Sequence, residues 1–214
     1  PFAPDERMQN ILVDAAAVAN ATARAIAFRW RTDASRIYDD RKWHTYFVGG
    51  DYQWLRDEGR GGRYLDARTF FFYVATVNTP AMALKIVGAG SQYAGADVDA
   101  DGNFFDGSKR YRLDLPADVP AKNFWSICVY DTQTRSELQT GQPFPSLNNL
   151  RGSLQTNDDG SVDILFGPDE PAELATNWIQ TVPGKGWFVA LRLYGPLDPW
   201  FDKTWRLSEI EAVK

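Results

Sequence analysis

The stretch GWFVALRLYG, residues 186–195, decides the fold because its side chains divide between two faces. Successive side chains of a β-strand point to opposite faces of the sheet. One resulting set is apolar throughout and suits a buried core; it consists of Trp187, Val189, Leu191 and Leu193. The other set consists of Phe188, Ala190, Arg192 and Tyr194. We therefore expect a strand whose first set packs into the core of a β-rich domain.

Further short strands and tight turns surround this stretch over residues 84–214. The segments that predict strands are LKIVGA (84–89), SQYAGADVD (91–99), NFFDGSKRYRLDLP (103–116), NFWSICVYD (123–131), GSVDILFGP (160–168) and NWIQTV (177–182). Clusters such as DADGN (99–103) and VPGKG (182–186) separate them and are typical of turns. Six or seven short strands with such turns favour an antiparallel β-sandwich of jelly-roll type.

Residues 1–83 have a different, helical character. Segment 4–28, PDERMQNILVDAAAVANATARAIAF, begins with residues that favour helix starts and repeats apolar residues at spacings of three and four. A second helix is expected from Asp66, whose carboxylate can cap its first turn. The whole chain is therefore predicted to be α+β, with two or three N-terminal helices in residues 1–83 that pack on the jelly-roll-like domain of residues 84–214.

The composition argues against two classes of protein. A net charge of −5 and an isoelectric point of about 4.9 do not suit a nucleic-acid-binding protein, which needs a basic surface. One Cys and one His cannot supply the ligands of a structural zinc site. We therefore expect no nucleic-acid partner and no structural zinc.

Membrane and export signals are not evident in the sequence. No uninterrupted apolar run approaches the roughly 20 residues that cross a bilayer, so we predict no transmembrane segment. No signal peptide is visible, but the chain begins at Pro1 rather than Met, which indicates a processed or trimmed start. The compartment stays open, with the periplasm or export slightly favoured over the cytoplasm.

The polar stretch YDTQTRSELQTG, residues 130–141, directly follows an apolar strand. Asp131 and Arg135 can pair across a turn, because a guanidinium offers a rigid fork to a carboxylate. No Gly, Asn or Pro of the kind that forms hairpin tips occurs before Gly141, which indicates a long ordered loop. Two interpretations remain open: a structural loop held by its own side chains, or a loop that faces a ligand.

Asp97, Asp99 and Asp101 match the opening of a calcium-binding loop, in which alternate oxygens surround the cation. The acid expected at the twelfth position of such a loop is replaced by Ser108. A hairpin turn at the Asp-Gly pair explains the same residues without a metal. We therefore expect no cofactor, with calcium as the alternative.

His44, the one histidine, lies among aromatic residues in RKWHTYF (41–47). A Ser-His-Asp triad would need this residue, but no serine of the chain lies in a G-x-S-x-G elbow. A catalytic role for His44 therefore stands beside a simpler interpretation as a hydrogen-bonding or surface histidine.

Several long segments resemble the bacterial family of unknown function numbered 1214. They are YRLDLPADVPAKNFWSICVYDTQTRSELQTGQPFPSLNN (111–149), NDDGSVDILFGP (157–168) and NWIQTVPGKGWFVALRLYGPLDPWFDKTW (177–205). Upstream, GSQYAGADVDADGNFFDGSK (90–109) and KWHTYFVGGDYQWL (42–55) are similar to longer proteins in which this domain follows a domain of unknown function numbered 1254.

The resemblance implies helices that lead into a jelly-roll-like domain, an amino-terminal partner domain, and a chain that is part of a longer protein. It transfers no catalytic residue, because the family has no established activity. At the position of Glu137 the members more often have an apolar residue, which argues against Glu137 as a catalyst and against an Asp131–Glu137 acid-base pair.

Two functions follow as hypotheses. The first is a module that binds a small polar molecule or saccharide, or docks the partner domain, through aromatic side chains and the polar loop. Its ligand-binding candidates are Tyr93, Trp125, Tyr130, Asp131, Arg135, Trp178 and Trp187. The alternative is a hydrolase in which Asp131 and Arg135, together with His44, activate water and stabilise an oxyanion.

Overall fold

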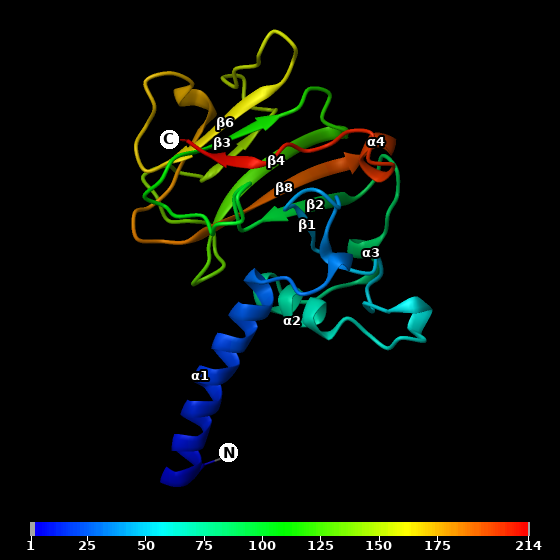
Figure 1. Cartoon of the computed structure of the whole chain (residues 1–214), viewed down its shortest axis with the longest axis vertical. Coiled ribbons are helices and arrows are strands. Elements are labelled where there is room, and N and C mark those ends of the chain that lie inside the picture. The colour runs from blue at the N-terminus through cyan, green and yellow to red at the C-terminus, as the bar shows by residue number, and fades with distance from the viewer. Residues whose placement is uncertain (1–2, 214) are drawn as a thin grey trace.

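The chain is an α+β protein with two mostly antiparallel sheets, as a computed structural model of residues 3–213 shows (Figure 1). The first sheet has the strand order β1-β2-β8-β4-β5. Its strands are β1 (His44–Thr45), β2 (Ser91–Ala96), β8 (Trp187–Pro196), β4 (Ala121–Asp131) and β5 (Ser146–Asn148). All neighbours in this sheet are antiparallel.

The second sheet has the strand order β7-β6-β3-β9. Its strands are β7 (Trp178–Gln180), β6 (Val162–Gly167), β3 (Tyr111–Leu115) and β9 (Ile210–Ala212). The β6–β7 pair is parallel, whereas β3 pairs antiparallel with both of its neighbours. Two sheets of this kind confirm the α+β class, while a jelly-roll arrangement of their strands stays a prediction.

Four α-helices accompany the sheets within residues 3–213. They are α1 (Glu6–Phe28), α2 (Leu65–Val74), α3 (Pro80–Ala83) and α4 (Asp198–Phe201). Three short 3₁₀ turns, η1 (Asp33–Ser35), η2 (Asp57–Gly59) and η3 (Ala175–Asn177), lie in the connections. The three helices of the N-terminal part agree with the two or three that the sequence predicts.

The core between the two sheets contains the set of β8 side chains that the sequence assigns to it. Trp187, Val189, Leu191 and Leu193 are each at most 1% exposed. They belong to one cluster with Ile127 of β4, Leu113 of β3 and Ile164 of β6, so both sheets contribute to it. Burial of this apolar face is the main contribution to the stability of the sheet pair.

A second apolar cluster covers the outer face of the five-stranded sheet. It is built from the N-terminal part of the chain and comprises Ala27, Phe47, Val48, Trp54, Ala67, Phe70, Phe71 and Ala83. Tyr93 of β2 packs against it from the sheet. In Figure 1, α2 and the segment that contains β1 lie beside β2 on this side of the sheet.

The strand predicted over residues 84–89 is absent from the structure, and β2 begins only at Ser91. Gly88 and Gly90 have φ angles of 73° and 68°, which extended strands do not adopt. Ile86 and Val87 are about half exposed, so the apolar residues that suggested a strand are not in the core.

Helix α1 extends away from the rest of the molecule (Figure 1), and Ala27 is its one buried residue. The composition of this helix bears on the prediction of no transmembrane segment, which stays a prediction. Asp14 and Arg24 interrupt the apolar run, but an 18-residue window within α1 has a mean hydropathy of 1.5, so this helix could cross a membrane by length and composition only.

Candidate functional site

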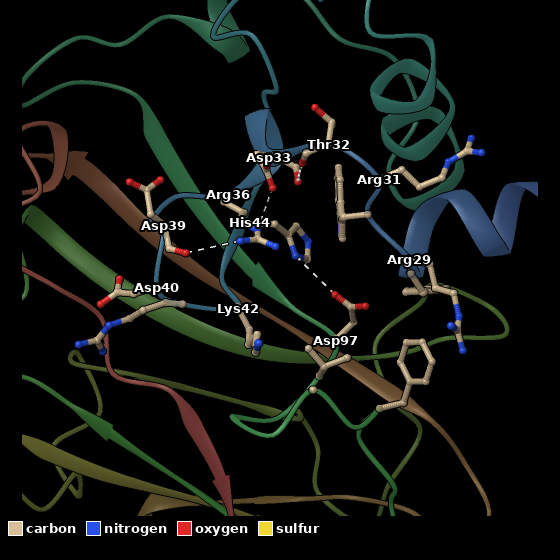
Figure 2. Close-up of a pocket in the computed structure, with 17 residues that line it drawn as sticks. Arg29, Arg31, Thr32, Asp33, Arg36, Asp39, Asp40, Lys42, His44 and Asp97 are labelled. Atoms are coloured by element: carbon tan, nitrogen blue, oxygen red, sulfur yellow. Dashed lines mark hydrogen bonds and ion pairs between the residues drawn. The ribbon is translucent and has the colours of Figure 1, made fainter.

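A polar pocket of about 610 Å³ lies where residues 28–42 meet the turn that follows β2 (Figure 2). His44 of β1 and Asp97, directly after β2, are among its lining residues. Antiparallel pairing of β1 with β2 places His44 opposite Gly95, two residues before Asp97. The register of a two-residue strand therefore brings together residues that are far apart in the sequence.

The His44 ring is held in an aromatic environment with a tight floor. Its centroid lies 4.6 Å from that of Trp30 and 5.7 Å from that of Phe70. A Cβ atom at Gly95 would lie 2.4 Å from His44 Nε2, so no larger residue fits at that position without moving the ring. This close approach fixes the orientation of the imidazole toward Asp97.

His44 Nδ1 lies 3.5 Å from Asp97 Oδ1, and each residue is only about 5% exposed (Figure 2). Burial lowers the pKa of His44 to about 3, and it raises the pKa of Asp97 to about 7. Removal of water disfavours the charged form of both groups. The environment therefore favours a neutral imidazole beside a protonated carboxyl group.

Two buried polar atoms of the pocket-lining residues have no hydrogen-bond partner among residues 3–213. They are Nδ1 of His44 and Nε1 of Trp30. A distance of 3.5 Å is too long for a good hydrogen bond, so Asp97 does not satisfy Nδ1. A buried polar atom without a partner costs roughly 1–3 kcal/mol, so a molecule that forms hydrogen bonds with these two atoms would offset that cost.

The rim of the pocket carries charges of both signs. Arg31 pairs with Asp66 at 2.6 Å, and Arg41 donates a hydrogen bond to the carbonyl oxygen of Leu207. Within the described part of the chain, Arg29 and Lys42 have no ion-pair partner. The Arg29 guanidinium instead lies 5.3 Å from the centre of the Phe104 ring.

The three residues of the calcium hypothesis have separate environments. Asp97 lies against His44, whereas the carboxylate of Asp99 accepts hydrogen bonds from the backbone amides of Asp101 and Asn103. Residues 3–213 contain no group of three or more His, Cys, Asp or Glu side chains that could hold a metal ion. The Asp99 carboxylate therefore takes part in a tight turn, while the expectation of no cofactor stays a prediction.

The polar loop of residues 130–141 is held by its own contacts. Asp131 pairs with Lys185 rather than with Arg135, and its carboxylate also accepts hydrogen bonds from the amides of Gln133 and Thr134. Burial raises the pKa of Asp131, but these hydrogen bonds outweigh it and the pKa lies below its ordinary value. These contacts fit the structural interpretation of the loop.

Arg135 and Arg24 connect the same loop to the helices. The Arg135 guanidinium lies 4.3 Å from the centre of the Tyr73 ring in α2. Arg24 of α1 donates to the carbonyl oxygen of Thr132 at 2.7 Å. Neither arginine lines the His44 pocket, so the three catalytic candidates His44, Asp131 and Arg135 do not share that pocket.

The aromatic ligand-binding candidates separate into two groups. Trp125 and Trp187 belong to the core between the sheets, and Trp178 donates its indole N–H to the carbonyl oxygen of Gly167. Tyr93 and Tyr130 instead line a second pocket on the outer face of the five-stranded sheet. The sequence did not single out Arg192 of that pocket, although it is the one charged residue on either face of its strand.

The helices and the two β-sheets define the chain as an α+β protein. Residues 90–198 match the family described as "Protein of unknown function (DUF1214)", which is more than half of the chain. The chain belongs to this family, as the resemblance of its strand segments indicates.

Two solved structures are similar to this chain. The VPA0106 protein from Vibrio parahaemolyticus has a TM-score of 0.54 and 22% sequence identity, over 77% of this chain and 40% of that one. An uncharacterised protein from Burkholderia cenocepacia has a TM-score of 0.39 and 17% identity, over 99% of this chain and 44% of that one. The first likeness concerns the fold alone. This chain spans less than half the length of either protein, and no curated protein matches it.

Proposed function

We propose that the domain binds a small polar molecule in the pocket of His44 and Asp97. The observation that carries this proposal is the pair of buried atoms without partners, His44 Nδ1 and Trp30 Nε1. A ligand with hydroxyl or carboxylate groups would accept a hydrogen bond from the Trp30 indole and bond to the imidazole. It would thereby remove the free-energy cost of the two unpaired groups.

The lining favours a sugar or a hydroxylated organic acid as the ligand. Saccharides combine many hydroxyl groups with apolar ring faces, which suit a pocket that contains both charged groups and aromatic rings. Arg29 and Lys42 supply cations without ion-pair partners in the described chain, while Phe104 is 46% exposed and offers a ring face. A carboxylate on the sugar would add a charged contact to these cations.

The test uses the fact that the chain has one histidine, so that all imidazole NMR signals come from His44. The protein is titrated with glucose, galacturonate and citrate while the His44 and Trp30 side-chain signals are followed. We expect saturable shifts of both residues with at least one of the three. His44→Gln should weaken that binding by about 10-fold, as the loss of one hydrogen bond in a buried site predicts.

The matched control is Asp158→Asn, which changes one polar group in the 157–161 turn, away from the pocket. It should leave the affinity unchanged. Shifts confined to other tryptophans, with His44 and Trp30 unaffected by all three compounds, would overturn the proposal for this pocket.

A hydrolase is the second function, and the proximity of His44 to Asp97 is the observation that favours it. The Asp97 carboxyl group, whose pKa burial raises to about 7, can take a proton from a water molecule and return it near neutral pH. Asp131 and Arg135 have less support as the reacting pair, because Lys185 and Tyr73 already contact them. Ester and glycoside turnover that falls in Asp97→Asn but not in Asp131→Asn would support catalysis here, and the reverse result would restore the Asp131 site.

An amino-terminal partner domain remains part of the proposal. Its support is the family resemblance of residues 42–55 and 90–109 to longer proteins. Co-purification of the two domains expressed as separate chains tests it, and failure of the two to associate would argue against docking.

A further inference from the structure

A second pocket, of about 200 Å³, lies between the outer face of the five-stranded sheet and helix α2. Its walls are mostly aromatic and aliphatic; they include Tyr46, Phe71, Tyr93, Tyr130, Phe188 and Ala190. Arg192 of β8 is the one ionised side chain in this lining. Apolar walls with one well-placed polar group are typical of small-molecule sites, and the volume suits a compact ligand.

Arg192 has no carboxylate partner among residues 3–213. Its guanidinium donates one hydrogen bond to the hydroxyl group of Tyr130. It also lies 5.5 Å from the centre of the Tyr130 ring and 5.9 Å from that of Tyr93. Arg112 on the other sheet, by contrast, is bound to Asp163 at 2.7 Å. Arg192 therefore keeps most of its donors for a molecule that enters the pocket.

The guanidinium remains charged in this environment. Burial lowers the pKa of Arg192, but the neighbouring Tyr130 hydroxyl outweighs burial and the pKa lies above its ordinary value. Burial, the largest influence on Tyr130, raises the pKa of its phenol, which therefore keeps its proton at neutral pH. Tyr130 can accept from Arg192 and donate its own proton to a ligand at the same time.

We propose that this pocket binds a compact organic carboxylate. The carboxylate would accept hydrogen bonds from the planar fork of Arg192 and from the Tyr130 hydroxyl, while its apolar body lies against Phe71, Tyr93 and Phe188. A free inorganic phosphate fits less well, because one cation and apolar walls cannot replace its hydration. This site is separate from the His44 pocket, since the two linings have no residue in common.

Calorimetric titration with benzoate, hexanoate, benzamide and inorganic phosphate tests the proposal. Benzamide keeps the ring of benzoate without its charge, and phosphate keeps a charge without an apolar body. We expect saturable binding of benzoate or hexanoate, and binding of benzamide and phosphate that is weaker by roughly 10- to 100-fold, as the loss of a charge-assisted hydrogen bond predicts. Equal binding of benzoate and benzamide would overturn the proposal, as would binding of none of the probes.

Two variants separate loss of the site from loss of the fold. Arg192→Met removes the charge and should reduce benzoate affinity by the same roughly 10- to 100-fold, whereas Arg112→Met removes a charge from the other sheet and should leave it unchanged. Ala75 is exposed at the edge of the pocket, so Ala75→Trp should block entry while Arg192 and the thermal unfolding midpoint stay as they are. Undiminished benzoate binding by either Arg192→Met or Ala75→Trp would place the ligand elsewhere and reject the site.

Discussion

The two faces of β8 are both largely covered, but by different parts of the chain. The inner face meets the second sheet, and Val189, Leu191 and Leu193 are fully buried there. The outer face meets the N-terminal segment, where Phe188 and Ala190 are 6% and 3% exposed while Arg192 and Tyr194 keep more contact with solvent. The inner contact is dense and apolar, whereas the outer one leaves a pocket beside a charged group.

This difference indicates where stability and ligand binding lie in the molecule. Sheet-to-sheet packing fills the space between strands with aliphatic side chains and leaves little room for a ligand. The irregular segment of residues 29–64 covers the outer face less completely, and each of the two pockets described above is lined in part by it. We therefore expect the inner face to control folding and the outer face to control binding.

The largest effect should come from a cavity on the inner face. Leu191→Ala should lower the free energy of unfolding by about 2–5 kcal/mol, because a fully buried leucine loses its packing. The neighbouring change on the outer face, Tyr194→Leu, removes a stack with Phe124 at 4.0 Å and should cost only about 0.5–1.5 kcal/mol. Urea unfolding measures both. Equal costs would show that the outer face carries as much of the stability as the inner one.

The next effect depends on pH, has a definite sign, and is expected from His44 and Asp97 on the outer side. The folded chain keeps a proton on Asp97 that the unfolded chain releases, so this residue lowers the free energy of unfolding as pH rises from 3.8 to about 7. The unfolded chain keeps a proton on His44 that the folded chain lacks. His44 therefore lowers the free energy of unfolding as pH falls from 6.5 to about 3. Between about pH 4 and pH 6.5 the two contributions cancel.

Single variants should reveal the two slopes separately. In Asp97→Asn only the contribution of His44 remains. The free energy of unfolding of this variant, relative to that of the parent chain, should therefore rise by up to about 1.4 kcal/mol per pH unit between about pH 4 and pH 6.5. His44→Gln should give the opposite slope, and the exposed control Asp158→Asn should give neither. Denaturant unfolding at several pH values measures the differences. A protonated imidazole at pH 5.5 by NMR in the parent chain would show an ion pair instead and contradict this account.

The inner face could be predicted from the sequence. Alternate side chains of GWFVALRLYG lie on opposite faces of the strand, and one of the two sets is entirely apolar. The polar pair could not be predicted. His44 meets Asp97 only through a two-residue strand paired with β2, and no propensity identifies so short an element. Arg192 was assigned to the correct face, but its pocket depends on how residues 46–75 cover that face. The sequence shows that Tyr93 and Tyr130 are aromatic, but it does not show that they line a common pocket.

The smallest effect is expected at α1, which contacts the outer side only near its end. Ala27 is its one buried residue, and Asn20 and Arg24 contact Tyr73 and the 132–133 loop. A variant that lacks residues 3–19 keeps all of these contacts, so its free energy of unfolding should change by less than about 1 kcal/mol.

Arg24→Ala in the intact chain removes the hydrogen bond to Thr132 and should cost about 1 kcal/mol, slightly more than the deletion. Urea unfolding of both variants gives the order. A deletion that costs several kcal/mol would mean that the exposed apolar residues of α1 are packed in solution against a surface absent from the single chain, and the outer side would then carry stability that its own contacts do not explain.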